Sequence, residues 1–96
     1  MSIRVTLNCP LNPGQLDQLK PFLEANLPNV RSFSGNQRVT VLFNEEGTEM
    51  LLDEQWQSIE SHRTYLAFIE ENGVLQQLAA FLSETPEIRY FREAAL

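Results

Sequence analysis

The 96-residue sequence predicts one α+β domain, spanning residues 1–96, in which a four-stranded antiparallel sheet carries helices on one face. Three observations support this prediction. Apolar side chains recur with a period of two in four short segments, as in strands with one buried face. They recur at helical spacing in the longer segments between these strands. The elements follow one another as strand, helix, strand, strand, helix pair, strand, which is the split βαβ arrangement.

The four strands are expected at residues 3–8, 38–43, 50–56 and 88–92, each with one face directed at the helices. By this parity the inward side chains are Ile3, Val5, Leu7, Val39, Val41, Phe43, Met50, Leu52, Glu54, Trp56, Ile88 and Tyr90. The sequence Glu-Glu-Gly-Thr at residues 45–48 predicts a hairpin turn between the two middle strands.

The first helix is expected to begin with Asn12 as its N-cap and Pro13 in its first position, which both residue types favour. Pro21 lies inside this helix, lacks an amide donor and crowds the preceding turn, so a kink or an early break is expected there. After Pro28, residues 30–33 are either a short helical continuation or irregular chain.

The second helix is expected to follow Ser58 as its N-cap, to extend to Asn72 and to end at Gly73. The stripe of this helix that faces the sheet contains His62, Tyr65, Leu66 and Ile69. A further helix follows, and its inward apolar side chains are Val74, Leu75, Leu78, Phe81 and Leu82.

The sheet face without helices is expected to pack against the same face of a second copy. Its side chains include Thr6, Thr40, Leu42 and Leu51, which are too apolar to stay in water over a continuous sheet. A chain of 96 residues also buries only part of its apolar surface by itself. The sequence therefore predicts a homodimer.

The charge balance argues against several classes of partner. Seven basic and thirteen acidic side chains give a formal charge of −6, which repels phosphate backbones and anionic lipids, so neither nucleic acid nor a membrane is expected as a partner. No segment approaches the roughly 20 apolar residues that span a bilayer, and the N-terminal residues lack the pattern of an export signal. The lone Cys9 cannot form an intramolecular disulfide, which fits a reducing compartment, and a cytoplasmic location is expected.

Three segments carry a family resemblance. They are Phe-Ser-Gly-Asn at residues 33–36, Glu-Gln-Trp-Gln-Ser at 54–58 and Pro-Glu-Ile-Arg-Tyr-Phe at 86–91. In this order and spacing, the chain resembles the antibiotic biosynthesis monooxygenase family over residues 3–91. The resemblance implies a ferredoxin-like fold that pairs with a second copy as a dimeric α+β barrel.

Members of that family are cofactor-free oxygenases of phenolic or quinol substrates, haem-degrading enzymes, isomerases, or domains without known activity. The resemblance implies a cofactor-independent monooxygenase that acts on a small aromatic, phenolic or quinol-type compound. The alternatives are a non-catalytic dimeric domain that binds a small ligand or a partner, and an isomerase of the same fold. Cofactor-free oxygenation requires the protein to bind an aromatic ring, to remove a proton and to stabilise the anion in a dry pocket.

The candidate catalytic residues are Glu54, Tyr65 and His62. Glu54 shares a strand face with Trp56, so its carboxyl group must find a partner or hold its proton, and it is a candidate base. The alternative is an ion pair with Arg38, Arg63 or Arg89. Tyr65 stands where many members of the family carry a histidine, and it is a candidate hydrogen-bond donor to an oxyanion. His62, three positions earlier, either replaces that histidine or is a half-exposed residue of the first helical turn.

The candidate substrate-binding residues are Trp56, Asn8, Phe43, Leu52, Phe68 and Tyr90. Trp56 is either a flat surface for an aromatic ligand or a core residue. Asn8 resembles an asparagine that some family members direct at a ligand, but its parity opposes that of the inward residues, so its alternative is a turn or cap residue. Tyr90 and Arg89 resemble the family's C-terminal strand. Only one of the two can face the helices, and parity favours Tyr90.

No cofactor is expected. A single histidine and a single cysteine cannot supply a usual protein-only transition-metal site. Haem ligation in the manner of the family is not expected either, because Tyr65 stands in place of the histidine. The sequence also lacks a Gly-rich phosphate loop and a Ser-centred nucleophile elbow.

Overall fold

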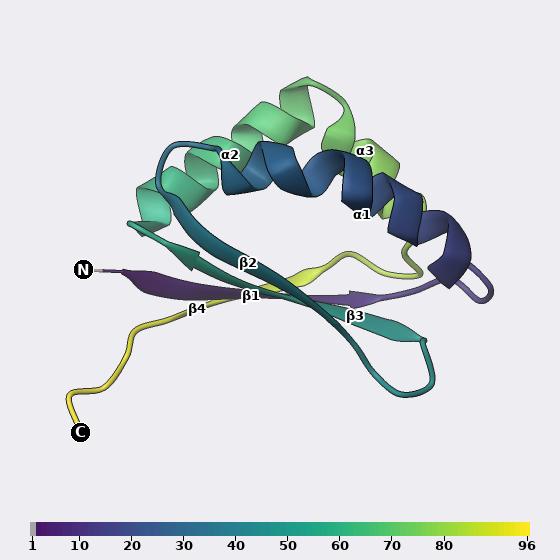
Figure 1. Ribbon diagram of the computed structural model, residues 1–96, viewed down its shortest axis with the longest axis horizontal. Coiled ribbons are helices and arrows are strands. Elements are labelled where there is room, and N and C mark those ends of the chain that lie inside the picture. The colour runs from purple at the N-terminus through teal and green to yellow at the C-terminus, as the bar shows by residue number, and fades with distance from the viewer. Residues whose placement is uncertain (1) are drawn as a thin grey trace.

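A computed structural model describes residues 2–96 and has two layers, an antiparallel sheet and a helical layer that covers one face of it (Figure 1). The strands are β1 (Ile3–Pro10), β2 (Asn36–Phe43), β3 (Glu49–Trp56) and β4 (Glu87–Phe91), and the helices are α1 (Leu16–Arg31), α2 (Ile59–Glu71) and α3 (Val74–Ala79). The strands lie in the order β2-β3-β1-β4, and every neighbouring pair is antiparallel. The predicted fold class is confirmed.

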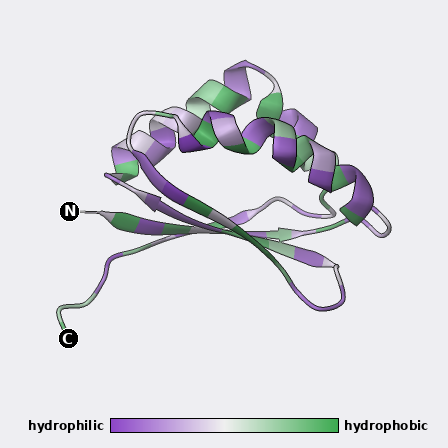
Figure 2. Ribbon diagram, in the orientation of Figure 1, coloured by the Kyte–Doolittle hydropathy of each residue, from purple (hydrophilic) through white to green (hydrophobic). Residues whose placement is uncertain are grey.

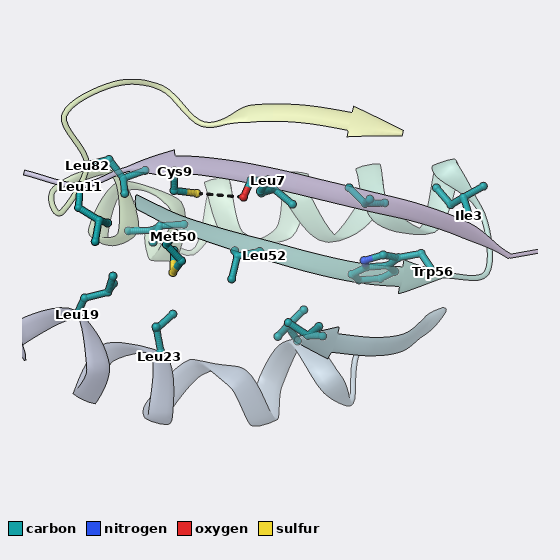
Figure 3. Close-up of a cluster of buried hydrophobic side chains, with 14 residues drawn as sticks. Ile3, Leu7, Cys9, Leu11, Leu19, Leu23, Met50, Leu52, Trp56 and Leu82 are labelled. Carbon is teal, nitrogen blue, oxygen red and sulfur yellow. Dashed lines mark hydrogen bonds between the residues drawn. The ribbon is translucent and has the colours of Figure 1, made fainter. Parts of the chain in front are cut away.

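Alternate side chains of β1 and β3 form the floor of the hydrophobic core. Buried residues alternate with less buried ones along both strands, and hydrophobic and hydrophilic residues alternate along β1 (Figure 2). The register places Leu7 opposite Leu52 and Cys9 opposite Met50. From the helical layer, Leu19 of α1 packs toward this floor (Figure 3). The predicted inward parity of these strands is therefore confirmed.

The start of α1 differs from the prediction. The helix begins at Leu16, and its N-cap residue is Gln15, whose side chain makes no capping hydrogen bond. Asn12 is not the N-cap, because its side-chain amide donates to the backbone carbonyl groups of Ala80 and Leu82, at 3.4 and 3.1 Å. This residue therefore ties the end of β1 to the segment after α3.

The two prolines inside α1 do not break it. The helix extends without interruption from Leu16 to Arg31, so the early break predicted at Pro21 is wrong and the chain after Pro28 continues as helix. Both prolines lie on the exposed side of the helix. The carbonyl groups that lose their amide donors, those of Asp17 and Glu24, belong to exposed residues and can be hydrated.

The predicted limits of α2 are confirmed. The Ser58 side chain accepts a hydrogen bond from the backbone N–H of Ser61 at 3.1 Å, as an N-cap does. At the other end Asn72 is the C-cap, and Gly73 follows with a φ of 88°. Gly35 reaches the start of α2, since its carbonyl accepts from the Gln57 N–H at 2.7 Å and a Cβ on it would lie 2.5 Å from the Ser61 hydroxyl oxygen. This close approach gives a physical reason for glycine in the segment Phe-Ser-Gly-Asn.

In the described part of the chain, residues 2–96, no helix has the length and apolar character to cross a membrane.

Candidate functional site

A largely apolar cavity of about 280 Å³ lies between the sheet and the helices. Its walls come from β1, β2, β3, β4, all three helices and the segment before β4. The polar or charged residues among those that line it are Asn26, Glu54, His62, Tyr65, Glu70 and Thr85. Its volume is at the lower end of the range of ordinary ligand pockets, so it suits one small molecule.

Glu54 is a buried carboxylic acid in this wall. The alternation of β3 directs it inward beside Trp56, and only 4% of its surface is exposed. The indole N–H of Trp56 donates to Glu54 Oε1 at 2.7 Å. Burial raises the pKa of Glu54 to about 7, against the lowering effect of the Trp56 hydrogen bond, and the charge of Asp53 adds to the rise. At neutral pH the group is thus poised between acid and base.

His62, in the first turn of α2, is fully buried rather than half-exposed. Its Nδ1 lies 2.9 Å from the hydroxyl oxygen of Tyr90. Its Nε2 lies 3.9 Å from Glu54 Oε1 and has no hydrogen-bond partner within residues 2–96. Burial, followed by the charge of Arg63, lowers the pKa of His62 to about 4. The imidazole is therefore neutral at pH 7 and forms no ion pair with Glu54.

The arginines considered as partners of Glu54 lie elsewhere. Arg38 binds Asp53 and Thr40 on the sheet face without helices. Arg89 pairs with Glu87 at 3.1 Å, and the Arg63 guanidinium lies 5.8 Å from the centre of the Tyr90 ring. The structure thus favours the buried-acid interpretation of Glu54 over the ion pair.

Tyr65 lies on the same helical stripe as His62 and is half-buried in the cavity wall. Its ring packs against those of Trp56 and Phe33, with centroids 5.4 and 5.1 Å apart. Burial, and after it the charge of Glu54, raises the pKa of Tyr65 to about 12. The phenol therefore keeps its proton at neutral pH and is able to donate it in a hydrogen bond.

Of the predicted substrate-binding residues, Leu52 lines the cavity, and five others do not: Trp56, Asn8, Phe43, Phe68 and Tyr90. Trp56 is fully buried behind Glu54, so it is a core residue. Asn8 pairs with Leu51 on the opposite sheet face, as its parity indicated. Phe43 lies at the end of β2, and half of the Phe68 surface is exposed. Direct contact with a ligand in this cavity is therefore not supported for these residues.

The cavity wall also contains residues that were not among the predicted site residues. Leu23, Leu27 and Val30 of α1 line it, together with Asn26 and Thr85. The helical spacing of the three apolar residues indicates an inward face, but apolar side chains on such a face are ordinarily core residues and carry no signal of a cavity. Thr85 precedes β4 and carried no periodic signal.

Within residues 2–96, no group of three or more His, Cys, Asp or Glu side chains is arranged to hold a metal ion. The arrangement that is present is a protonatable acid beside a neutral imidazole. Glu54 Oε1 and His62 Nε2 are 3.9 Å apart, a separation that one ligand oxygen about 2.8 Å from each would match once the side chains that cover Nε2 make room for it. Such an oxygen can exchange a proton with the carboxyl group while the imidazole holds it.

No protein-family model matches the sequence, and no curated protein matches it either. Solved structures do match. A conserved protein from Methanosarcina mazei Go1 has 16% identity and a TM-score of 0.86, over 98% of this chain and 94% of that protein. A proposed antibiotic biosynthesis monooxygenase from Nitrosomonas europaea has 12% identity and a TM-score of 0.85, over 98% and 91%. A structure named antibiotic biosynthesis monooxygenase has 10% identity and a TM-score of 0.84, over 96% and 98%. The chain therefore has the ferredoxin-like α+β fold of the antibiotic biosynthesis monooxygenase structures, as the resemblance of its sequence predicted.

Proposed function

We propose that the protein binds a small, neutral phenolic compound in the cavity, removes its proton and promotes its oxygenation as a cofactor-independent monooxygenase. The observation that carries this proposal is the pairing of Glu54 with the unpartnered His62 Nε2 in an apolar wall. The cavity lining contains no Lys or Arg, so nothing in it compensates the charge of an anionic substrate. A neutral aromatic compound with one ionisable hydroxyl group fits both features.

The expected chemistry begins with transfer of the hydroxyl proton to Glu54. The phenolate then supplies electrons to O₂, and a carbon–oxygen bond forms at the ring carbon opposite the hydroxyl group. The proton from Glu54 passes to the peroxide, and loss of water, which takes the ring hydrogen, leaves a quinone. One phenol and one O₂ thus give one quinone and one water. The protein supplies the base, the hydrogen bonds to the oxyanion and a dry site.

We predict that Glu54→Gln lowers turnover of a phenolic probe about 100-fold or more, because a general base contributes about 10² to 10⁴. The probe is 1-naphthol, and the measurements are O₂ uptake and formation of 1,4-naphthoquinone, corrected for the rate without protein. Glutamine keeps an oxygen that can accept from Trp56, so folding and naphthol binding should be retained. Binding is followed by the fluorescence of Trp56, the single tryptophan.

The alternatives give different results in the same experiment. Binding of 1-naphthol without O₂ uptake or proton exchange would favour the ligand-binding domain. Incorporation of deuterium from D₂O into the ring without O₂ uptake would favour proton transfer, as in an isomerase. Equal rates of quinone formation for the wild type and Glu54→Gln would remove the catalytic role of Glu54.

We also propose that the helix-free sheet face pairs with the same face of a second copy. Leu42 on this face is 45% exposed, and Asn8 Oδ1 is buried without a hydrogen-bond partner among residues 2–96. Arg4 and Arg38 both contact Asp53 at the centre of the face, at 2.7 and 3.5 Å. Asp53 therefore compensates one of these two positive charges, which lowers the cost of covering this part of the face.

Sedimentation at micromolar concentration is expected to show a dimer, and Leu42→Glu is expected to shift it to monomer, because it adds a charge to each side of the interface. Phe68→Glu is the matched control, since Phe68 is similarly exposed but lies on α2. A wild-type monomer, or equal dissociation of both variants, would contradict the assignment of this face.

A further inference from the structure

Tyr90, Val5 and Glu54 form one row across the sheet. The register pairs Val5 of β1 with Glu54 on one side and with Tyr90 of β4 on the other. His62 of α2 reaches both ends of this row, since its Nδ1 lies 2.9 Å from the Tyr90 hydroxyl and its Nε2 lies 3.9 Å from Glu54 Oε1. The two nitrogens of the His62 ring therefore lie next to two different groups, the hydroxyl of Tyr90 and the carboxyl of Glu54.

We propose that Tyr90 is a positioning residue that fixes His62 in the tautomer with its hydrogen on Nε2, so that this N–H is directed toward Glu54 and the ligand oxygen. A neutral imidazole has one N–H donor and one acceptor nitrogen. When the Tyr90 hydroxyl donates to Nδ1, that nitrogen is the acceptor and the hydrogen must be on Nε2. This inference deepens the proposed function and rests on it for the role of the ligand oxygen.

The surroundings favour this direction of the Tyr90 hydrogen bond. The Nε2 atom faces Oε1 of Glu54, which is only an acceptor when the carboxyl group is ionised. A nitrogen lone pair at this position would be repelled by that oxygen, whereas an N–H is attracted. The Arg63 guanidinium lies 5.8 Å from the centre of the Tyr90 ring, and a positive charge over the ring makes its hydroxyl group a better hydrogen-bond donor.

A neutral N–H donor suits an apolar cavity. Burial keeps His62 uncharged at neutral pH by lowering its pKa to about 4. The N–H can therefore stabilise a phenolate oxygen without the cost of burying an imidazolium ion. Glu54 takes the proton from the hydroxyl group, and the Nε2–H of His62 donates to the oxygen that remains. Tyr90 acts only through His62, since it does not line the cavity.

The test is the tautomer of His62, read from two- and three-bond ¹H–¹⁵N correlations in ¹⁵N-labelled protein at pH 7 to 8. His62 is the single histidine, so its signals need no further assignment. The wild type is expected to show a protonated Nε2 and an unprotonated Nδ1. Tyr90→Phe, which removes only the hydroxyl group, is expected to give a mixture of tautomers. The matched control, Tyr65→Phe, removes a hydroxyl group from the cavity wall and should leave the wild-type tautomer unchanged.

A protonated Nδ1 in the wild type would overturn the inference, and this outcome requires no variant to fold. An unchanged tautomer in folded Tyr90→Phe would overturn it as well. Addition of 1-naphthol to the wild type separates the two proposals. A shift of the Nε2–H proton resonance to lower field supports both proposals. A fixed Nε2–H tautomer that does not respond to 1-naphthol supports the role of Tyr90 and counts against the proposed function.

Discussion

Trp56→Ala is expected to lower the free energy of unfolding by about 3 to 5 kcal/mol, the usual cost of removing a large buried aromatic side chain. Trp56 is fully buried, and its ring contacts those of His62 and Tyr65, with both centroids at 5.4 Å. The substitution also removes the indole N–H that donates to Glu54. Urea unfolding followed by far-ultraviolet circular dichroism measures the loss.

The matched control is Phe68→Ala. Phe68 belongs to the same group of aromatic side chains, through a contact with Phe33 at 5.4 Å, but half of its surface is exposed. Its replacement is expected to lower the free energy of unfolding by about 1 kcal/mol or less, because the substitution removes few buried contacts. If Trp56→Ala cost no more than Phe68→Ala, Trp56 would not be part of the core.

Glu54→Gln and His62→Asn are expected to change the pH dependence of stability in opposite directions. The pKa of Glu54 is about 7 in the folded protein, against an ordinary value of 4.5. The contribution of Glu54 to the free energy of unfolding is therefore fully present below pH 4.5 and is lost as the pH rises to 7. The pKa of His62 is about 4 in the folded protein, against an ordinary value of 6.5. The contribution of His62 to the free energy of unfolding is therefore fully present above pH 6.5 and is lost as the pH falls to 4. In the wild type the two trends largely offset each other between these limits.

A variant that lacks the Glu54 carboxyl group or the His62 imidazole therefore shows the pH dependence of stability that comes from the remaining group. Glu54→Gln is expected to gain stability relative to the wild type as the pH rises from 4.5 to 7, and His62→Asn is expected to lose it as the pH rises from 4 to 6.5. Over its full pH range, each of these changes in the free energy of unfolding is on the order of 3 kcal/mol. Urea unfolding at steps of pH, with each variant compared with the wild type, removes the contribution of all other carboxyl groups. Parallel pH profiles for the two variants would contradict the buried state of the pair.

Most of the fold could be predicted from local sequence patterns, because these patterns depend on backbone geometry and on contacts between residues that are neighbours in the chain. The parity of β3 depends only on backbone geometry, and the Ser58 cap depends on three neighbouring residues, so both could be read from the sequence. Asn12 also has the local pattern of a cap, but the backbone carbonyl groups after α3 compete for its amide. That contact joins residues 70 positions apart and leaves no local signal.

The sequence could predict which side chains of the candidate site face the helical layer, but it could not predict how deeply each of them is buried. Strand parity and helical spacing directed Glu54, His62 and Tyr65 to the same side, and the structure places all three in one cavity wall. Parity could not show that Trp56 lies behind this wall rather than in it. The burial of His62 was not predictable either, because it depends on β4, whose Tyr90 covers one side of the ring.

The position of β1 in the middle of the sheet has a consequence for how the chain acquires its structure. β1 is the first of these four strands to be synthesised, yet its two neighbours are β3 and β4, which begin at residues 49 and 87. The two backbone edges of β1 therefore have no strand partner until β3 has been made, and the second partner is the last of the four strands. Pairing over such sequence separations slows folding and prolongs exposure to aggregation. The cavity wall is completed only when β4 docks, so a nascent chain that has folded up to α3 would already be compact but would lack the Tyr90 contact to His62.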